Sequence, residues 1–508
     1  MPCVATVKAA RDAVVAALTV PGLATIVDLV AYPEGDLADP DGRSVVVAGA
    51  GGAARLRPDG SHEVIHGSDP VARTDPMAFL PYERELADPC PPNARNAYPD
   101  PARRLLSLFA DPDRSPDVAV VHTPRHYFPD EGGHRGEHGS LDVVQSRAPL
   151  IVAGAAAARD GVVADHARIV DVAPTLLRAC GIGEARQVDG AGAALDGRAR
   201  TDLVVEPGAG RWVIGLLWDG AHCSDLLQLT AAGELPALAR LLERGTALAG
   251  GAVAEFPSVT LCNHTSALTG VGPGRHGVLG NVFFDRATGE QVVPNDATTW
   301  HRSATWLRPG TATVFEMLTT ARPGSFTACV NEAIERGAGY STMQLVRAQA
   351  GAGGSGDLDS SLPDADASPF LTDRAHLADR YYRWGTRVDD AGVAQVLQVW
   401  RDPASAPSLL WWSNVVTDAG HHAGGPRSAI ARGSLRDADR RLAALLDHLD
   451  RLGVTDDVTF LLTADHGFEA ADEAVTGSWR TALHAALDPL GVPWRDEGPG
   501  FVYLGVGG

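Results

Sequence analysis

Three short apolar runs in this chain each lead into an aspartate, and this pattern restricts the fold more than any other feature. The runs are residues 212–218, 408–417 and 458–464, and the aspartates are Asp219, Asp418 and Asp465. Apolar runs of this length that alternate with helical patterns are typical of a parallel sheet covered by helices. Ligands bind at the carboxyl ends of the strands in such sheets. The sequence therefore predicts an α/β fold in which three carboxylates meet at one sheet edge and hold a cation.

Histidines stand beside two of these aspartates. His466 follows Asp465 directly, and His421 and His422 follow Asp418 within four residues. A mixed set of Asp and His ligands is typical of zinc or another borderline divalent metal. Local spacing leaves open which of His421 and His422 is the ligand. A lone aspartate at a strand end is more often a helix cap, so the prediction depends on the pairs occurring together.

A hydroxyl residue stands where a helix is expected to begin. Thr260 lies in the stretch EFPSVTLCNHTSALTG, residues 255–270. Free backbone N–H groups and the helix dipole favour an anion at such a helix start. Thr260 is thus a candidate nucleophile for attack on phosphorus, and the alternative is an ordinary N-cap threonine.

The charge balance limits the partners of the chain. It has 43 basic and 63 acidic residues and a formal net charge of −20. This charge disfavours nucleic acid polymers and anionic membrane surfaces, so a small anionic substrate would need local cations. No stretch approaches the ~18 apolar residues of a membrane span, and we expect neither a transmembrane segment nor a cleaved signal peptide. Six scattered cysteines without a C-x-x-C pair favour a cytoplasmic location.

Five motifs follow one another in the second part of the chain. They are LLWDG (216–220), FPSVTLCNHTSALTGVGPGRHGVLGN (256–281), NEAIERGAGYST (331–342), TDAGHHAGGP (417–426) and TADHGF (463–468). In order and spacing they resemble the type I phosphodiesterase/nucleotide pyrophosphatase branch of the alkaline phosphatase superfamily. The resemblance implies a sandwich of helices around a mostly parallel central sheet. One departure is Leu261-Cys262, where the family usually has Phe-Pro.

The resemblance also implies a ligand set for two divalent metal ions, which we expect to be zinc, with manganese or iron as alternatives. One ion would be held by Asp219, Thr260, Asp465 and His466, and the other by Asp418 and His422. The family spacing D-x-x-x-H-x-x-x-P, here Asp418 to Pro426, selects His422 over His421. By the same resemblance Asn281 would steady a phosphoryl oxygen.

The third histidine of the family is missing from its usual place after the Asp-His-Gly motif. Only His484 lies beyond His466, in a stretch with the pattern of an amphipathic helix. Upstream segments look like the missing part of the family: GGHRGEHGSLD (132–142), RAPLIVAG (147–154) and ARIVDVAPTLLRACGI (167–182). His138 would then be the third histidine, with His134 as the alternative within the same motif.

This order of segments predicts a circularly permuted chain. Residues 1–183 would be the C-terminal part of the catalytic core, 184–211 a linker, and 212–508 the N-terminal and central part, with a cap at about 282–407. Residues 500–505 should then lie near residues 1–10. The alternative is an independent accessory domain at 1–183, with His484 as the ligand.

The resemblance implies a metal-dependent phosphoric ester hydrolase that acts on a small phosphate ester through a phosphothreonine at Thr260. A phosphonoacetate hydrolase-like C–P hydrolase, a phosphomonoesterase and a related mutase are alternatives among the enzymes. A non-catalytic metal-binding module is the alternative outside them. Arg336, in the NEAIERGAGYST motif, is either a contact for the anion or half of a structural ion pair.

Overall fold

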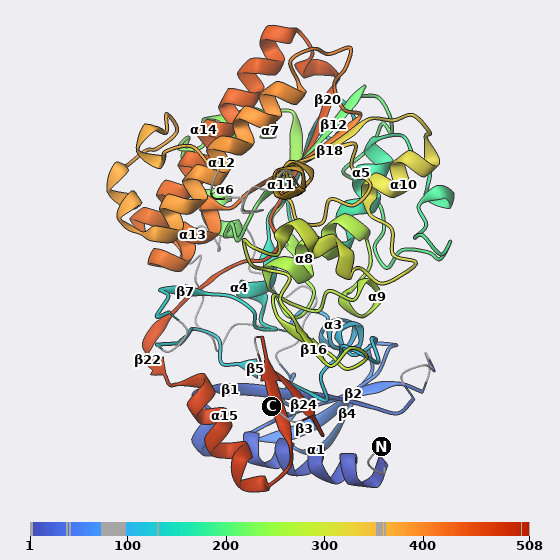
Figure 1. Ribbon diagram of the computed structural model, residues 1–508, viewed down its shortest axis with the longest axis vertical. Helices are drawn as coiled ribbons and strands as arrows, with labels where there is room; N and C mark the ends of the chain where they lie inside the picture. The colour runs from blue at the N-terminus through green and yellow to red at the C-terminus, as the bar shows by residue number, and fades with distance from the viewer. Residues whose placement is uncertain are drawn as a thin grey trace.

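Two β-sheets organise the protein, and each contains strands from distant parts of the chain (Figure 1). The computed structural model describes residues 4–36, 39, 42–72, 98–129, 132–351, 359, 362–498 and 500–506. The larger sheet has eight strands and lies in the upper part of Figure 1, and a seven-stranded sheet lies in the lower part.

The eight-stranded sheet is mostly parallel. Its strands, in spatial order, are β10 (Gly161–Val163), β13 (Gly245–Leu248), β9 (Leu150–Gly154), β20 (Val458–Thr463), β12 (Trp212–Trp218), β19 (Leu409–Asn414), β17 (Thr327–Val330) and β18 (Tyr340–Ser341). From β20 to β18 all neighbours are parallel, whereas β9 pairs antiparallel with both β13 and β20. The predicted α/β fold with helices around a mostly parallel sheet is thereby confirmed.

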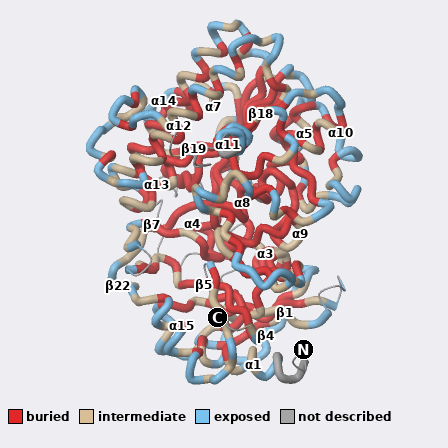
Figure 2. Tube along the Cα trace, in the orientation of Figure 1, coloured by how far each residue is buried: buried red, intermediate tan, exposed pale blue. Residues whose placement is uncertain are grey.

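Helices cover both faces of this sheet, and the side chains of β12 show how. Val213 and Leu217 belong to a core shared with α5 (Val172–Ala179), α8 (Thr260–Thr269) and α10 (Val314–Ala321). The alternate side chains Ile214 and Leu216 face a second core, built with α6 (Cys223–Ala231), α7 (Pro236–Leu242), α12 (Arg380–Val399) and α14 (Ala429–Leu452). Successive strand residues point to opposite faces, so a strand apolar throughout is buried on both sides. Figure 2 shows the resulting band of buried chain through the upper part of the molecule.

The seven-stranded sheet is antiparallel throughout. Its strands, in spatial order, are β23 (Trp494–Glu497), β24 (Phe501–Leu504), β5 (Val118–His122), β1 (Val27–Glu34), β2 (Ser44–Gly49), β3 (Gly52–Leu56) and β4 (His62–Gly67). Strands from the two ends of the sequence are paired here, because Phe501 of β24 lies opposite Ala119 of β5. One face packs on α1 (Val4–Leu18) and α15 (Trp479–Leu487) through Val14, Leu483 and Val502.

The two sheets share one apolar core. Leu29 and Val47 of the seven-stranded sheet lie in the same buried cluster as Val213 of the eight-stranded sheet, with α3 (Pro101–Leu108) also contributing. Residues 184–211 run along this core, and Leu203 and Val204 are buried in it. Asp171 holds the segment by accepting hydrogen bonds from the backbone N–H groups of Arg198 and Arg168.

A search of the described helices for a membrane span finds none of sufficient length and apolar character.

Candidate metal centre

The carboxyl ends of three adjacent strands bring the predicted aspartates together. Asp219 directly follows β12, and Asp465 follows β20 after one intervening residue. Both are buried, at 5% and 0% exposure. The Asp219 backbone N–H donates to the carbonyl of Asn414 at the end of β19 (2.9 Å), which aligns the ends of these neighbouring strands.

Asp418 reaches the site from a helix instead of a strand. The apolar run 408–417 was expected to be one strand, but β19 stops at Asn414 and α13 (Val416–Gly424) begins two residues later. Asp389 of α12 caps this helix, because its carboxylate accepts from the backbone N–H groups of Val415 and Val416 (2.8 and 3.1 Å). Asp418 and His422, four residues apart on α13, consequently project from one helix face.

A short strand pair delivers His138 to the site. β7 (Gly136–Glu137) pairs antiparallel with β21 (Glu469–Ala470), which follows the Asp465-His466 motif closely. His138 comes directly after β7, and its ring stacks on that of His466 with 3.7 Å between centroids. Gly136 allows this approach, since a Cβ there would lie 2.5 Å from the backbone oxygen of His421.

The predicted ligands form two groups. In the first, Nε2 of His466 lies 3.1 Å from Oδ2 of Asp465 and 3.9 Å from Oδ1 of Asp219. In the second, Nε2 of His138 lies 3.2 Å from Nε2 of His422 and 3.9 Å from Oδ1 of Asp418. Within each group the ligand atoms lie within 4.8 Å of one another, which is close enough for a shared metal ion.

Each of these histidines presents the same nitrogen to the site. The Nδ1 atoms of His138, His422 and His466 lie 3.0 Å from the backbone oxygens of Ser258, Gly136 and Gly467, respectively. Donation of Nδ1–H to a carbonyl fixes the tautomer and leaves a lone pair on Nε2. That is the arrangement of a metal-ligating imidazole.

Buried polar atoms without partners coincide with the proposed ligands. The described residues offer no hydrogen-bond partner to Oδ1 of Asp219, Oδ2 of Asp465, Oδ1 of Asp418 or Nε2 of His466. Such atoms are rare in folded proteins, and a bound ion is one of the few explanations for several of them in one place. The residues therefore fit divalent metal ions.

Burial shifts the pKa values of these groups in the direction that favours a cation. Burial, followed by the charge of Asp465, raises the pKa of Asp219 to about 7. Burial and the neighbouring aspartates also raise the pKa of Asp418 well above its usual range. Burial lowers the pKa of His138 and His422 well below theirs, so both rings are neutral. Carboxylates crowded in this way are stabilised in their charged form by a divalent cation.

Thr260 and Asn281 meet at the start of α8. The helix begins at Thr260, as predicted, and Thr260 is 9% exposed. The side-chain oxygen of Asn281 accepts from the backbone N–H of Leu261 (3.0 Å), which holds the asparagine beside the helix start and leaves its Nδ2 as a donor. Thr260, Asp219, Asp418 and His422 line one cavity of about 570 Å³.

A buried pair that sequence reasoning did not single out supports the aspartates. Nε2 of His264 lies 3.6 Å from Oδ2 of Asp219 and 3.6 Å from Oδ2 of Asp465. Its Nδ1 lies 2.8 Å from Oε2 of Glu332. Although burial opposes the charged ring, Glu332 and the two aspartates raise the pKa of His264 well above its usual value.

Glu332 is held firmly in the core. Its Oε2 also accepts from Trp411 Nε1 (3.0 Å) and Ser413 Oγ (2.9 Å). Glu332 lies in the NEAIERGAGYST motif, for which the sequence predicted a role of Arg336 and none of Glu332. Arginine is a common contact for anions, so Arg336 was one candidate for the substrate site. Arg336 instead pairs with Glu316 (2.8 Å), which is the structural alternative.

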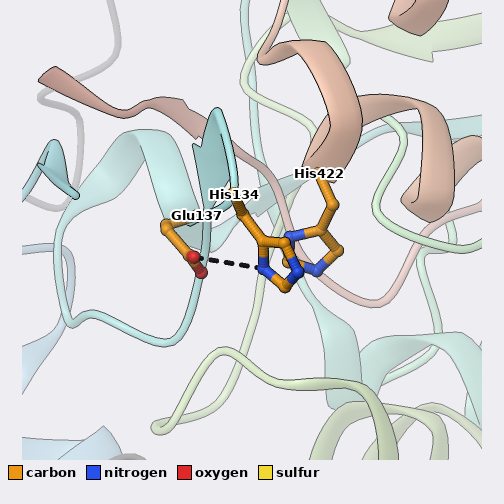
Figure 3. A group of neighbouring side chains, drawn as sticks. All are labelled: His134, Glu137 and His422. Carbon is orange, nitrogen blue, oxygen red and sulfur yellow. Dashed lines mark ion pairs between the residues drawn. The ribbon is translucent and has the colours of Figure 1, made fainter. Parts of the chain in front are cut away.

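The remaining histidines take different places. His134 lies beside the second group: its Nδ1 is 3.2 Å from Oε1 of Glu137, and its ring centroid is 4.3 Å from that of His422. Figure 3 shows this trio, with His422 projecting from α13. His421 turns away, stacks on Phe468 (5.3 Å between centroids) and is outside the groups. His484 is on α15, where it pairs with Asp488 (3.2 Å).

A family model matches the part of the chain that carries most of the candidate site. The sequence model of the family "Type I phosphodiesterase / nucleotide pyrophosphatase" matches residues 213–501, more than half of the chain. An uncharacterized pyrophosphatase/phosphodiesterase of Schizosaccharomyces pombe is 37% identical over 98 residues, which are 19% of each chain. The chain thus matches about a fifth of the length of this curated relative.

Two solved structures are also similar to parts of the chain. Murine ectonucleotide pyrophosphatase/phosphodiesterase 5, an inactive variant in complex with AMP, is 16% identical with a TM-score of 0.36, over 52% of this chain and 59% of that one. Phosphonoacetate hydrolase from Sinorhizobium meliloti, in complex with phosphonoacetate, is 24% identical with a TM-score of 0.31, over 51% and 57%. Identification depends on the family model, whose matched residues include Asp219, Thr260, Asp418 and Asp465. The chain belongs to the type I phosphodiesterase/nucleotide pyrophosphatase family.

Proposed function

We propose that the protein is a two-metal hydrolase of small phosphate esters that acts through a phosphothreonine at Thr260. The observation that carries this proposal is the convergence of three histidine Nε2 atoms and three aspartate carboxylates in two groups. Several of these buried atoms have no partner among the described residues, and Asp219, Asp418 and His422 line the same cavity as Thr260. Family membership supports phosphodiester or pyrophosphate hydrolysis as the reaction class.

Each metal ion has its own group of residues in this proposal. Asp219, Thr260, Asp465 and His466 would hold one, and Asp418, His422 and His138 the other. Bound metals of this kind act as Lewis acids: they lower the pKa of a coordinated hydroxyl and stabilise charge on phosphoryl oxygens. Zinc is the expected metal, because Asp and His together are its usual ligands, and manganese and iron accept the same set.

The residues of the chain perform the transfer. Thr260 loses its hydroxyl proton, and its Oγ1 attacks phosphorus in line while the P–O bond to the leaving alcohol breaks and that alcohol takes up a proton. The start of α8 favours the negative charge of the phosphoryl group, and Nδ2 of Asn281 donates to one of its oxygens. Water then attacks the phosphothreonine, which restores the threonine and releases the second product.

The space for the leaving group comes from the predicted cap at about 282–407. Trp300 and Trp384 line the cavity with 5.4 Å between their ring centroids, and Tyr381 and Arg380 lie on the same wall. Aromatic walls bury apolar or aromatic groups, and Arg380 adds one positive charge. We therefore expect an ester with an aromatic leaving group to be a better substrate than one with a small polar group.

We further propose that the core is circularly permuted and that 1–183 and 212–508 form one catalytic unit. Three contacts support this: β9 lies between β13 and β20, β24 pairs with β5, and His138 stacks on His466. The packing of α1 against β24 and α15 also agrees with the expected proximity of residues 1–10 and 500–505. Residues 184–211 would then join two ends that are free in the unpermuted order.

A substrate panel tests the proposal. The zinc-loaded protein is incubated with p-nitrophenyl phosphate, bis-p-nitrophenyl phosphate and phosphonoacetate. Preferred release of p-nitrophenol from the diester is expected. Preference for the monoester or for phosphonoacetate would assign one of the alternative activities, and no turnover of any compound would contradict an enzymatic role.

The nucleophile is tested by Thr260→Ala, which should abolish turnover while most of the bound metal remains, because six other side chains would hold the ions. Thr265→Ala is the matched control: its hydroxyl donates to the backbone oxygen of Leu261 (2.6 Å), so it should retain activity. Metal is measured by elemental analysis. Turnover by Thr260→Ala near the level of the native protein would refute the phosphothreonine.

A further inference from the structure

A second cavity lies where the hairpins of the seven-stranded sheet meet α3 and the chain around α9 (Pro273–His276). Its volume is about 270 Å³, and four arginines line it: Arg43, Arg103, Arg168 and Arg275. We call it the arginine cavity. Four guanidinium groups around one small space are unexpected in a chain with a net charge of −20.

Two of the arginines already have partners. Arg103 pairs with Glu255 (2.5 Å) and with Asp100 (2.5 Å). Arg275 pairs with Asp196 and with Asp189 (2.5 Å each). Asp196 and Glu255 also line the cavity, so four arginines and two carboxylates face the same space.

Other guanidinium donors have none. The Nε atoms of Arg43 and Arg168 and the Nη2 atom of Arg103 are buried, and no described residue accepts a hydrogen bond from them. Burial, together with repulsion from Arg103, lowers the pKa of Arg168, although Glu255, Asp171 and Asp100 oppose the shift. A buried N–H group without an acceptor is costly, and an anionic oxygen beside it would offset that cost.

The cavity also holds an acceptor without a donor. Glu255 is fully buried; its Oε1 accepts from Arg103, whereas its Oε2 has no partner among the described residues. A ligand that satisfies the whole wall needs several anionic oxygens and one hydroxyl donor. A hydrogen phosphate group has both, whereas sulfate at neutral pH has acceptors only.

We propose that the arginine cavity binds a phosphate group of a small molecule, at a place separate from the candidate metal centre. The three free guanidinium donors bind its oxygens, and the P–OH group donates to Glu255. The cavity adjoins the loop that leads to Thr260, because the backbone N–H of Glu255 donates to Asn263 (2.7 Å), whose amide in turn donates to the carbonyls of Pro257 and Val259.

Equilibrium dialysis of the metal-loaded protein against labelled inorganic phosphate tests this proposal. The native chain is expected to bind one phosphate more than Arg168→Gln, and phosphate binding at this place should weaken at least about tenfold in the variant. Sulfate in excess should displace this phosphate poorly. Phosphate bound at the metal centre would be the same in the native chain and in Arg168→Gln, so it cancels from the comparison. This test can therefore succeed or fail independently of the proposed hydrolase activity.

The matched control is Arg401→Gln, which removes the same charge from an exposed position and should bind as the native chain does. Arg43→Gln is a second variant on another segment and should show the same loss as Arg168→Gln. Thermal unfolding in phosphate-free buffer checks folding, and Arg168→Gln should be no less stable than the native chain there. Equal phosphate uptake by the native chain and by both cavity variants would overturn the proposal, as would displacement by sulfate as effective as by phosphate.

Discussion

At the scale of single residues, the orientation of the histidines is the most informative feature. His138, His422 and His466 reach the site from three different segments, yet in each the Nδ1 atom is bound to a backbone oxygen and Nε2 is turned inward. His421, which packs on Phe468, also has its Nδ1 bound to a backbone oxygen, so what distinguishes the other three is that their Nε2 atoms converge on the aspartates. Backbone oxygens thus fix the orientation of the three rings so that Nε2 is the nitrogen available to a metal ion.

The adjacent pair on α13 allows a direct test. His422→Ala should lose one of two bound metal ions, because it removes an Nε2 ligand from the second group. His421→Ala should keep both ions and lose only the packing of its ring on Phe468, about 1–3 kcal/mol of stability. Metal content after gel filtration and thermal unfolding measure the two effects. The assignment is wrong if His421→Ala is the variant that loses metal.

Glu332 should act as a positioning residue for the same centre. Glu332→Gln weakens the hold on His264 and through it on Asp219 and Asp465. Replacement of such outer partners typically lowers metal affinity or activity by about 10–100-fold. Competition with a chelator measures the affinity, and Glu316→Gln is the control, because it weakens the ion pair with Arg336 and keeps an oxygen to accept from the Thr313 backbone N–H. Native metal affinity in Glu332→Gln would contradict this role.

Most of the candidate site could be predicted from the sequence, because its residues stand directly after apolar strands or at a helix start. Asp219 and Asp465 follow apolar strands closely, and Thr260 stands at the start of a helix. His264 and Glu332 were missed because each looks like an ordinary buried polar residue until the fold joins them. The choice of His422 over His421 also needed the family spacing, since both lie on the same short helix.

At the scale of elements, the two-residue strand β7 is important for the candidate metal centre because it positions His138. Its pairing with β21 is what carries His138 across to His466, and it packs beneath α13. No periodicity can predict an element this short. The sequence motif around His138 predicted the histidine but not the strand that positions it.

A glycine substitution tests this element. Gly136→Ala should push β7 away from α13, because the added Cβ would meet the His421 backbone oxygen at 2.5 Å and Gly425 Cα at 3.0 Å. We expect a loss of about 1–3 kcal/mol in stability and weaker binding of the metal ion at His138. Gly183→Ala is the control, because nothing lies within 4 Å of its added Cβ. Unchanged metal binding in Gly136→Ala would show that β7 does not position His138.

At the scale of the whole molecule, the permutation proposal predicts that the order of the segments can be reversed. A chain that starts at residue 212, runs to 506, continues through a short flexible linker into residue 4 and ends at 211 keeps the buried Leu203 and Val204 and should fold and retain metal-dependent activity, because permutation is tolerated at surface positions. Circular dichroism and the diester assay measure the result. A soluble, folded product without activity would show that the order of the segments matters for the site.

The pairing of strands from the two ends of the sequence has a consequence for synthesis on the ribosome. β9 is made early, but one of its two neighbours, β20, emerges about three hundred residues later, and β5 waits still longer for β24. Until then both strands have unpaired backbone groups that can associate with other chains. Contacts so distant in sequence also slow folding. This topology therefore predicts that the nascent chain is most prone to association with other chains before its C-terminal strands are made.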